Sequence, residues 1–193
     1  MEICVAASAG FCFGVSRAVQ LTERLAQEGR RVATLGPLIH NPQCVARLES
    51  MGVVTAASIE DIPAGYEVVI RSHGVSATVE EELCRRGFVV HDATCPFVAK
   101  IHRLARQAGQ EGRFLLVAGD ASHPEVQGIV GHTDGEVRVF SDLEQLQAIL
   151  KEQSAQKNPM IVAQTTFQVT KWSECTLFAK KVCTNSKIFD TIC

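Results

Sequence analysis

Apolar stretches rich in β-branched residues recur along the chain, separated by segments in which apolar residues return every three or four positions. Stretches of the first kind are typical of parallel strands that are covered on both faces. They occupy residues 3–7, 31–35, 67–71, 88–91, 114–118, 160–164 and 187–190. Helical periodicity occupies residues 15–28, 42–51, 76–86, 97–109 and 169–182. This alternation predicts βαβ units and therefore an α/β fold with parallel sheets.

Residues suited to helix ends stand at several of these boundaries. Asn41 is expected to cap a helix that begins at Pro42, where the missing N–H of proline costs no hydrogen bond. Ser141 and Glu144 predict a capping box at the start of a further helix. Glycines are expected at the C-termini of three helices, at positions Gly29, Gly52 and Gly87.

A short internal repeat bears on the domain organisation. Residues 92–95 (Asp-Ala-Thr-Cys) follow one predicted strand, and residues 190–193 (Asp-Thr-Ile-Cys) follow the last one. The two segments are separated by about the length of one small domain. We therefore expect two similar α/β units, residues 1–95 and residues 96–193.

The composition is that of a globular protein, and the charge limits its partners. Of 193 residues, 46% are hydrophobic and 21% are charged, which is enough apolar surface to bury a core. The 19 Lys and Arg residues against 21 Asp and Glu residues give a net charge of -2 without a long basic run. Binding to nucleic acid or to an anionic membrane is therefore not expected. Since neither a secretion signal nor an apolar membrane span is found, a cytoplasmic location is expected.

The eight cysteines of a chain expected in the cytoplasm indicate metal ligands more than disulfides. Cys12, Cys95 and Cys193 are too far apart in the sequence for a zinc finger or for the compact cysteine run of bacterial ferredoxins. Three such thiolates can converge in space on an iron–sulfur cluster and leave one iron open to a substrate oxygen. Packing or structural roles are expected for the residues Cys4, Cys44, Cys84, Cys175, Cys183, His91, His102, His132 and Trp172.

Polar and thiol side chains follow the predicted strands at their carboxyl ends, where open parallel sheets bind ligands. In chain order they are Cys12, His40, His73, Cys95, His123 with Glu125, Thr165 with Thr166, and Cys193. One histidine after a strand is more often a structural loop residue, but the whole series favours a site. Histidines and hydroxyl groups beside a metal suit a phosphate or diphosphate, and Gly14 and Gly74 allow backbone N–H groups to approach such an anion.

Two interpretations of Glu125 remain open at this point. In a closed and partly desolvated site, a raised pKa would let the carboxyl group donate a proton near neutral pH. Alternatively, Glu125 is a first-turn glutamate that the helix dipole favours after Pro124.

Six segments in order along the chain carry a resemblance to a known family. They are residues 9–18, 36–41, 72–75, 92–96, 123–125 and 164–167. Together they resemble the signature of the 4-hydroxy-3-methylbut-2-enyl diphosphate reductases, also called the LytB family. The resemblance implies the last step of the methylerythritol phosphate route to isoprenoids. In that step an allylic alcohol diphosphate undergoes two-electron reductive dehydroxylation to isopentenyl and dimethylallyl diphosphates.

The same resemblance implies the roles of individual residues. Cys12, Cys95 and Cys193 match the three ligands of a [4Fe–4S] cluster, which receives electrons from ferredoxin or flavodoxin. His40, His73 and His123 match the histidines around the diphosphate. For catalysis, the matching residues are Glu125 as proton source, His123 in proton delivery, and Thr166 near the substrate hydroxyl, with Thr165 as the neighbouring candidate.

The resemblance implies a protein of three α/β units in a trefoil-like arrangement around a central cluster. This chain ends at the third matching cysteine. We therefore expect the third unit to be absent from the chain, and the chain alone to have little activity and an unstable or missing cluster. Two alternatives stay open. One is another enzyme with three cysteine ligands to a [4Fe–4S] cluster, of the quinolinate synthase type. The other is a non-enzymatic metal-binding or redox-sensing module.

Overall fold

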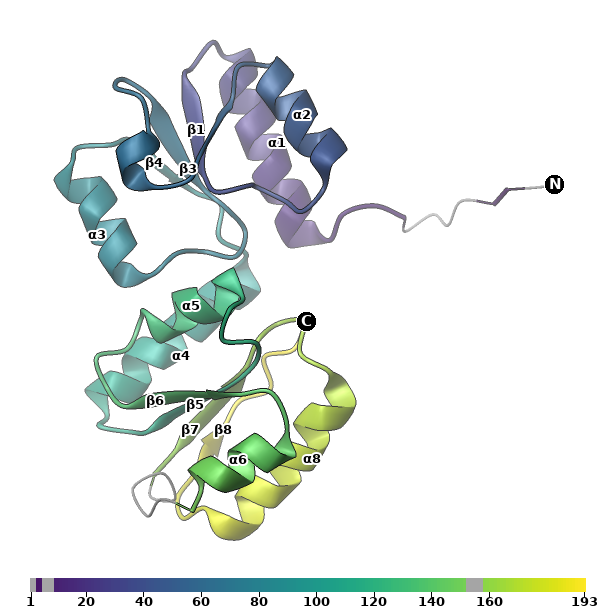
Figure 1. Ribbon diagram of the computed structural model, residues 1–193, viewed down its shortest axis with the longest axis vertical. Helices are drawn as coiled ribbons and strands as arrows, with labels where there is room; N and C mark the ends of the chain where they lie inside the picture. The colour runs from purple at the N-terminus through teal and green to yellow at the C-terminus, as the bar shows by residue number, and fades with distance from the viewer. Residues whose placement is uncertain (1–2, 5–8, 152–157) are drawn as a thin grey trace. The chain divides into compact units, whose positions relative to one another are not determined.

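The chain folds into two compact α/β units, each built on its own sheet. A computed structural model describes residues 3–4, 9–151 and 158–193 (Figure 1). Unit 1 comprises Met1–Ser72 and Arg86–Cys95, and unit 2 comprises His73–Arg85 and Pro96–Cys193. The expected α/β class with parallel sheets is confirmed.

Unit 1 contains a four-stranded parallel sheet in the order β2-β1-β3-β4. Its elements are α1 (Phe13–Gln27), β1 (Val32–Leu35), α2 (Pro42–Ser50), β2 (Val54–Ala56), a 3-10 turn (Ile59–Asp61), β3 (Glu67–Ile70) and β4 (Val90–Asp92). Leu25 of α1 and Leu48 of α2 pack with Val32 and Val69 of the two central strands. This packing fixes the helices against the sheet and leaves the loops at the carboxyl ends of β1, β3 and β4 for other contacts.

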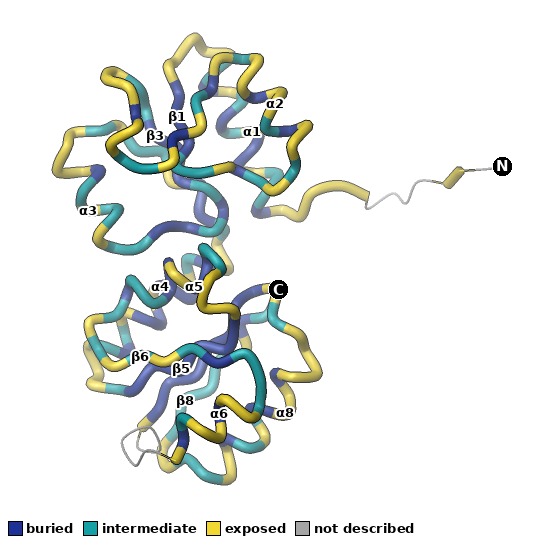
Figure 2. The backbone as a smooth tube through the Cα atoms, in the orientation of Figure 1, coloured by how far each residue is buried: buried dark blue, intermediate teal, exposed yellow. Residues whose placement is uncertain are grey.

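Unit 2 contains a second four-stranded parallel sheet, in the order β6-β5-β7-β8. Its elements are α3 (Ala77–Arg85), α4 (Pro96–Gln110), β5 (Leu115–Ala118), α5 (Pro124–Val130), β6 (Val137–Phe140), α6 (Leu143–Ile149), β7 (Met160–Ala163), α8 (Val169–Val182) and β8 (Lys187–Ile188). Leu116 packs with Trp172 of α8, whereas its neighbour Leu115 packs with Ile101 of α4 and Ile129 of α5. Successive residues of β5 thus point to opposite faces, and both faces are covered, which is why the central strands are buried (Figure 2).

Helix α3 follows β3 in the sequence but belongs to unit 2. Its first residue, Ala77, donates its N–H to the carbonyl of Gly131 at the end of α5, at 3.2 Å. The division of the chain into domains 1–95 and 96–193 stays a prediction, because compactness alone does not show that a segment folds by itself. Among the described helices, none combines the length and the apolar character that crossing a membrane requires.

Most of the predicted elements are confirmed, and the strands missing from the predictions are edge strands. The predicted strand at residues 3–7 falls largely outside the described residues. The predictions lack β2 and β6, which lie at the edges of their sheets and are only partly buried. Edge strands contain exposed polar residues such as Arg138, so they do not form the continuous apolar runs that identify central strands.

The predicted helix ends were right in four cases and wrong in one. Asn41 caps α2 through its side chain, which accepts the N–H of Cys44 at 2.9 Å. The helix C-termini contain the expected glycines, with positive φ at Gly29, Gly52 and Gly87. The prediction of a capping box from Ser141 and Glu144 is wrong, because the N-cap residue of α6 is Asp142, one residue later. Asp142 accepts the N–H of Gln145, and the Gln145 side chain accepts the N–H of Ser141, both at 2.9 Å.

Candidate functional site

Most of the predicted site residues follow the carboxyl ends of strands, in one unit or the other. In unit 1, His40 follows β1 and Cys95 follows β4, while Cys12 precedes α1. The remaining predicted residues belong to unit 2: His73, His123, Glu125, Thr165, Thr166 and Cys193. Each unit therefore contains some of the predicted residues.

In unit 1, the start of α1 lies directly against Cys95. A side-chain carbon at position 14 would lie 2.7 Å from Sγ of Cys95, so only glycine fits there while the thiol keeps its position. Cys12 is the N-cap residue of α1, but its side chain makes no capping hydrogen bond. Its thiol is exposed and free, whereas that of Cys95 is half-buried and free. Two predicted metal ligands thus flank one helix N-terminus.

Arg17 ties this helix to the loop that carries Cys95. Its guanidinium donates to the carbonyl of Thr94 at 2.9 Å and to that of Asp92 at 3.4 Å. The Asp92 side chain in turn accepts the N–H of Thr94 at 2.8 Å, which closes a tight turn before the cysteine. These contacts fix the backbone that precedes Cys95 against helix α1.

The backbone holds Cys95 and Cys193 by the same hydrogen bond, each within its own unit. The N–H of Cys95 donates to the carbonyl of Ser72 at 2.9 Å, and the N–H of Cys193 donates to the carbonyl of Thr165, also at 2.9 Å. Ser72 and Thr165 are each the second residue after a central strand. The exposed Cys193 is therefore fixed through its backbone to the loop after β7.

Glu125 is buried, with 2% of its surface exposed, in the first turn of α5. Its carboxylate accepts the backbone N–H of Thr165 at 2.6 Å and the hydroxyl of Thr165 at 2.8 Å. The side chain thus combines the first-turn position of one interpretation with the enclosed setting of the other. Because Thr165 also holds Cys193, one threonine connects the carboxylate to the backbone of the cysteine.

Two histidines lie near the start of α5 in unit 2. His123 caps α5, and its Nδ1 accepts the N–H of Glu125 at 3.2 Å. The rings of His73 and His123 meet edge to face, with their centroids 5.3 Å apart. His40 lies in unit 1, where its side chain is exposed in the loop after β1. Within unit 2, therefore, two of the three predicted histidines are brought together.

Thr166 and Thr165 differ in their surroundings. Thr166 is exposed, and its hydroxyl accepts a hydrogen bond from the side chain of Gln164 at 2.9 Å. The other side-chain atom of that amide, Oε1, accepts the N–H of Asp120 at 3.1 Å and so links the loops after β7 and β5. Thr165 is the residue that binds Glu125. The neighbouring position that the sequence offered as second choice is thus the partner of the buried carboxylate.

The cysteines expected to serve packing divide into two groups. Cys44 and Cys175 are buried in apolar clusters, as predicted, and burial raises the pKa of the Cys175 thiol to about 11. Cys183 is half-buried against the same cluster as Cys175. The interpretation is wrong for Cys84, which lies on α3 but is exposed, and for the exposed Cys4. A residue's place on a helix does not by itself show which way its side chain points.

Comparisons with known proteins give one family. Residues 3–193 match the family described as LytB protein. The 4-hydroxy-3-methylbut-2-enyl diphosphate reductase of Geobacter sulfurreducens is 43% identical over all of this chain and 67% of its own length. The enzyme of the same name from Aquifex aeolicus is 41% identical, over all of this chain and 66% of its own length. The chain thus spans about two thirds of the length of these relatives.

Solved structures agree with the sequence comparison. A structure of (E)-4-hydroxy-3-methyl-but-2-enyl diphosphate reductase, described as the terminal enzyme of the non-mevalonate pathway, is 40% identical with a TM-score of 0.85. It is matched over 99% of this chain and 68% of its own. The E-1-hydroxy-2-methyl-but-2-enyl-4-diphosphate reductase of Plasmodium falciparum shares the fold at 22% identity, with a TM-score of 0.86 over 97% of this chain and 59% of its own. The family match and the relatives of 40% identity or more show that the chain belongs to the LytB family.

Proposed function

We propose that this chain carries catalytic residues of an iron–sulfur reductase that converts (E)-4-hydroxy-3-methylbut-2-enyl diphosphate to isopentenyl and dimethylallyl diphosphates. The relatives described above carry the name of that activity. Since the chain spans about two thirds of their length, we assign the activity to a protein of their full length. The observation that carries the proposal is the buried Glu125, bound to the same threonine that holds Cys193.

The residues present fit a [4Fe–4S] cluster. Cys12, Cys95 and Cys193 are free thiols at the ends of helices or strands, and each is at least partly exposed, unlike the buried Cys175. Gly14 leaves Sγ of Cys95 unobstructed. When bound, the cluster would supply electrons and an iron with an open coordination position for the substrate hydroxyl.

Glu125 would supply a proton to the reaction. Reductive dehydroxylation breaks one C–O bond and consumes two electrons and two protons, one for the departing hydroxyl, which leaves as water, and one for the allylic carbon. The Thr165 hydroxyl can donate to Oε2 or accept from it, so this contact persists whether or not Oε2 carries a proton. Burial keeps bulk water from competing for that proton. His123 is the second residue proposed for proton delivery, because it lies directly before the helix that carries Glu125.

The substrate diphosphate would be held by His40, His73 and His123, with Thr166 near its hydroxyl. The edge-to-face pair of His73 and His123 supports this for unit 2, since one of the two rings also binds the backbone of Glu125 there. Imidazole N–H groups and hydroxyls are suitable donors to phosphate oxygens. A fixed diphosphate would keep the reacting carbon near the metal position.

Electrons would come from a one-electron carrier, ferredoxin or flavodoxin, as the resemblance implies. The cytoplasmic location stays a prediction, as does the expectation that neither nucleic acid nor a membrane is a partner. The cluster is to be tested before the donor, because without the cluster no electron carrier is required.

Anaerobic reconstitution with iron and sulfide tests the proposal. This chain and a version with the full length of its relatives would be compared by iron per protein, visible absorbance and turnover of the allylic diphosphate. We expect a four-iron cluster and turnover in the longer protein, both lost in Cys12→Ser, Cys95→Ser or Cys193→Ser, and little of either in this chain alone. Failure of the longer protein to bind iron would leave a zinc-binding or diphosphate-binding module.

A further inference from the structure

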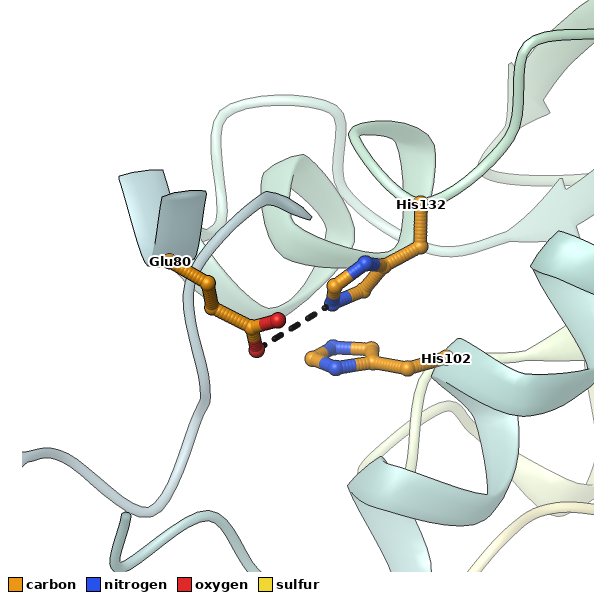
Figure 3. Close-up of side chains that lie close together, drawn as sticks. All are labelled: Glu80, His102 and His132. Carbon is orange, nitrogen blue, oxygen red and sulfur yellow. Dashed lines mark ion pairs between the residues drawn. The ribbon is translucent and has the colours of Figure 1, made fainter. Parts of the chain in front are cut away.

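A second group of metal-ligating side chains lies in unit 2, at the opposite end of α5 from Glu125. Glu80 comes from α3, His102 from α4, and His132 from the segment after α5. One potential ligand atom from each residue lies within 4.8 Å of the other two. Figure 3 shows the Glu80 carboxylate facing both imidazole rings. None of these residues is part of the proposed reductase site.

We propose that Glu80, His102 and His132 bind a divalent transition-metal ion, for which Zn²⁺ is the reference. Two imidazole nitrogens and one carboxylate oxygen are a donor set that zinc accepts in proteins. Three protein ligands leave a coordination position for water. The ion would join α3 to α4 and to the end of α5, three elements of the same unit. This proposal does not depend on the reductase activity.

The burial of the histidines supports the proposal. His102 is 4% exposed and His132 is 3% exposed, and Nε2 of His102 has no hydrogen-bond partner among the described residues. A buried polar nitrogen is normally satisfied, so an orphaned one points to a missing ligand. Burial lowers the pKa of His102 to about 3, with further contributions from His132 and Arg106, so the ring is neutral at neutral pH. Neutral imidazole is the form that binds metal ions.

The spacing between Glu80 and His132 is close to that of two ligands on one ion. Nε2 of His132 lies 3.8 Å from Oε1 of Glu80, which is too long for a hydrogen bond. Two ligands each about 2.1 Å from a tetrahedral zinc ion are roughly 3.4 Å apart. The hydrogen bond from Ala77 to Gly131 fixes the start of α3 beside His132, one turn before Glu80. These two ligand atoms are therefore only slightly farther apart than two ligands of one zinc ion.

Arg106 is the group that a metal ion would have to replace. Its Nη2 lies 3.2 Å from Nδ1 of His132 and 3.5 Å from Oε2 of Glu80. As a donor, Arg106 requires Nδ1 of His132 to be unprotonated, whereas an ion on Nε2 leaves the ring proton on Nδ1. Ion binding would therefore release Arg106 from His132, and its side chain, 45% exposed, can turn to solvent. Removing the positive charge of Arg106 should strengthen metal binding.

Zinc titration of the whole chain tests the site directly. Cys12→Ser, Cys95→Ser and Cys193→Ser are combined first, so that these thiols do not compete, and ZnCl₂ binding is then measured by calorimetry. We expect about one ion per chain, with binding weakened at least about tenfold by Glu80→Gln or His132→Asn and strengthened several-fold by Arg106→Gln. Co²⁺ bound in the same background should show no thiolate charge-transfer absorption.

The matched control is His91→Asn in unit 1. His91 also faces a glutamate, Glu67, at 2.6 Å, and Glu67 also contacts an arginine, Arg30, but among the described residues no second histidine converges on this pair. Zinc affinity should not change in this variant. Glu80 is only partly buried, so Glu80→Gln should keep the circular dichroism spectrum of the parent. Absence of zinc binding, an unchanged affinity in Glu80→Gln, or equal weakening in His91→Asn would each overturn the proposal.

Discussion

The sheets of units 1 and 2 have the same strand order, and each holds a cysteine beyond its last strand. In both, the cysteine N–H donates at 2.9 Å to a carbonyl two residues past the neighbouring central strand. The side chains around this common backbone differ. In unit 1, Gly14 lies against the thiol of Cys95, whereas in unit 2 the buried Glu125 binds Thr165, which holds Cys193. The sheet therefore determines the backbone position of the cysteine, and the neighbouring loops determine which side chains surround it.

The largest effect is expected from removing Glu125, the buried carboxyl group of unit 2. In the reconstituted protein of full length, Glu125→Gln should lower kcat by about 10²- to 10⁴-fold and leave KM little changed, because a lost proton source slows the chemistry and not binding. Steady-state kinetics with the allylic diphosphate measure both constants. Glu111→Gln, at the exposed end of α4, is the control and should keep normal kcat. Normal turnover in Glu125→Gln would remove its proposed role.

The next effect concerns the threonine that connects Glu125 to Cys193. Thr165→Val deletes the hydroxyl bound to Oε2 and leaves that buried oxygen without its donor, so we expect a loss of about 1–3 kcal/mol in the free energy of unfolding. Thr166→Val, at the exposed neighbour, should change it by less than about 0.5 kcal/mol. Denaturant titration measures both variants. Equal stability of the two would show that the Glu125 contact contributes little to unit 2.

In unit 1, the corresponding test is the close approach of Gly14 to Cys95. Gly14→Ala should favour the helix by propensity but displace the thiol, so iron uptake during reconstitution should fall about tenfold. Gln20→Ala, at an exposed position of the same helix, separates the effect on helix stability from that on the thiol. Iron per chain after gel filtration is the readout. Normal iron in Gly14→Ala would mean that the thiol moves freely.

The smallest effect is the pH dependence of an ion pair at the other end of the unit 2 sheet. Hydrogen bonds from Lys187, Gln107 and Arg113 lower the pKa of Glu111 to about 2. A lowered pKa in the folded state stabilises the fold above the ordinary value near 4.5, and this stabilisation is lost as the pH falls from about 4.5 toward 2. Glu111→Gln should therefore reduce the fall in denaturation midpoint across that range. An unchanged slope would show that solvent screens the pair.

The sequence predicts well what repeats along the chain and poorly what depends on distant contacts. Buried central strands such as β5 and β7 are continuous apolar runs, so their positions follow from the local sequence alone. The contact of Glu125 with Thr165 joins residues 40 positions apart, and no local pattern indicates which of two adjacent threonines faces the carboxylate. The convergence of His102 with His132 was likewise unpredictable, because helix α4 and the end of α5 meet only after folding.

The membership of α3 in unit 2 affects how the chain can be dissected. The chain passes from one unit to the other after Ser72, Arg85 and Cys95. A single protease cut at Cys95–Pro96 would therefore leave unit 2 made of two pieces of polypeptide. The amino-terminal piece would still contribute α3, with its fully buried Leu83, to the fold of the carboxyl-terminal piece. The nicked halves should therefore copurify, and the carboxyl-terminal half made alone would lack α3, which completes the interior of unit 2.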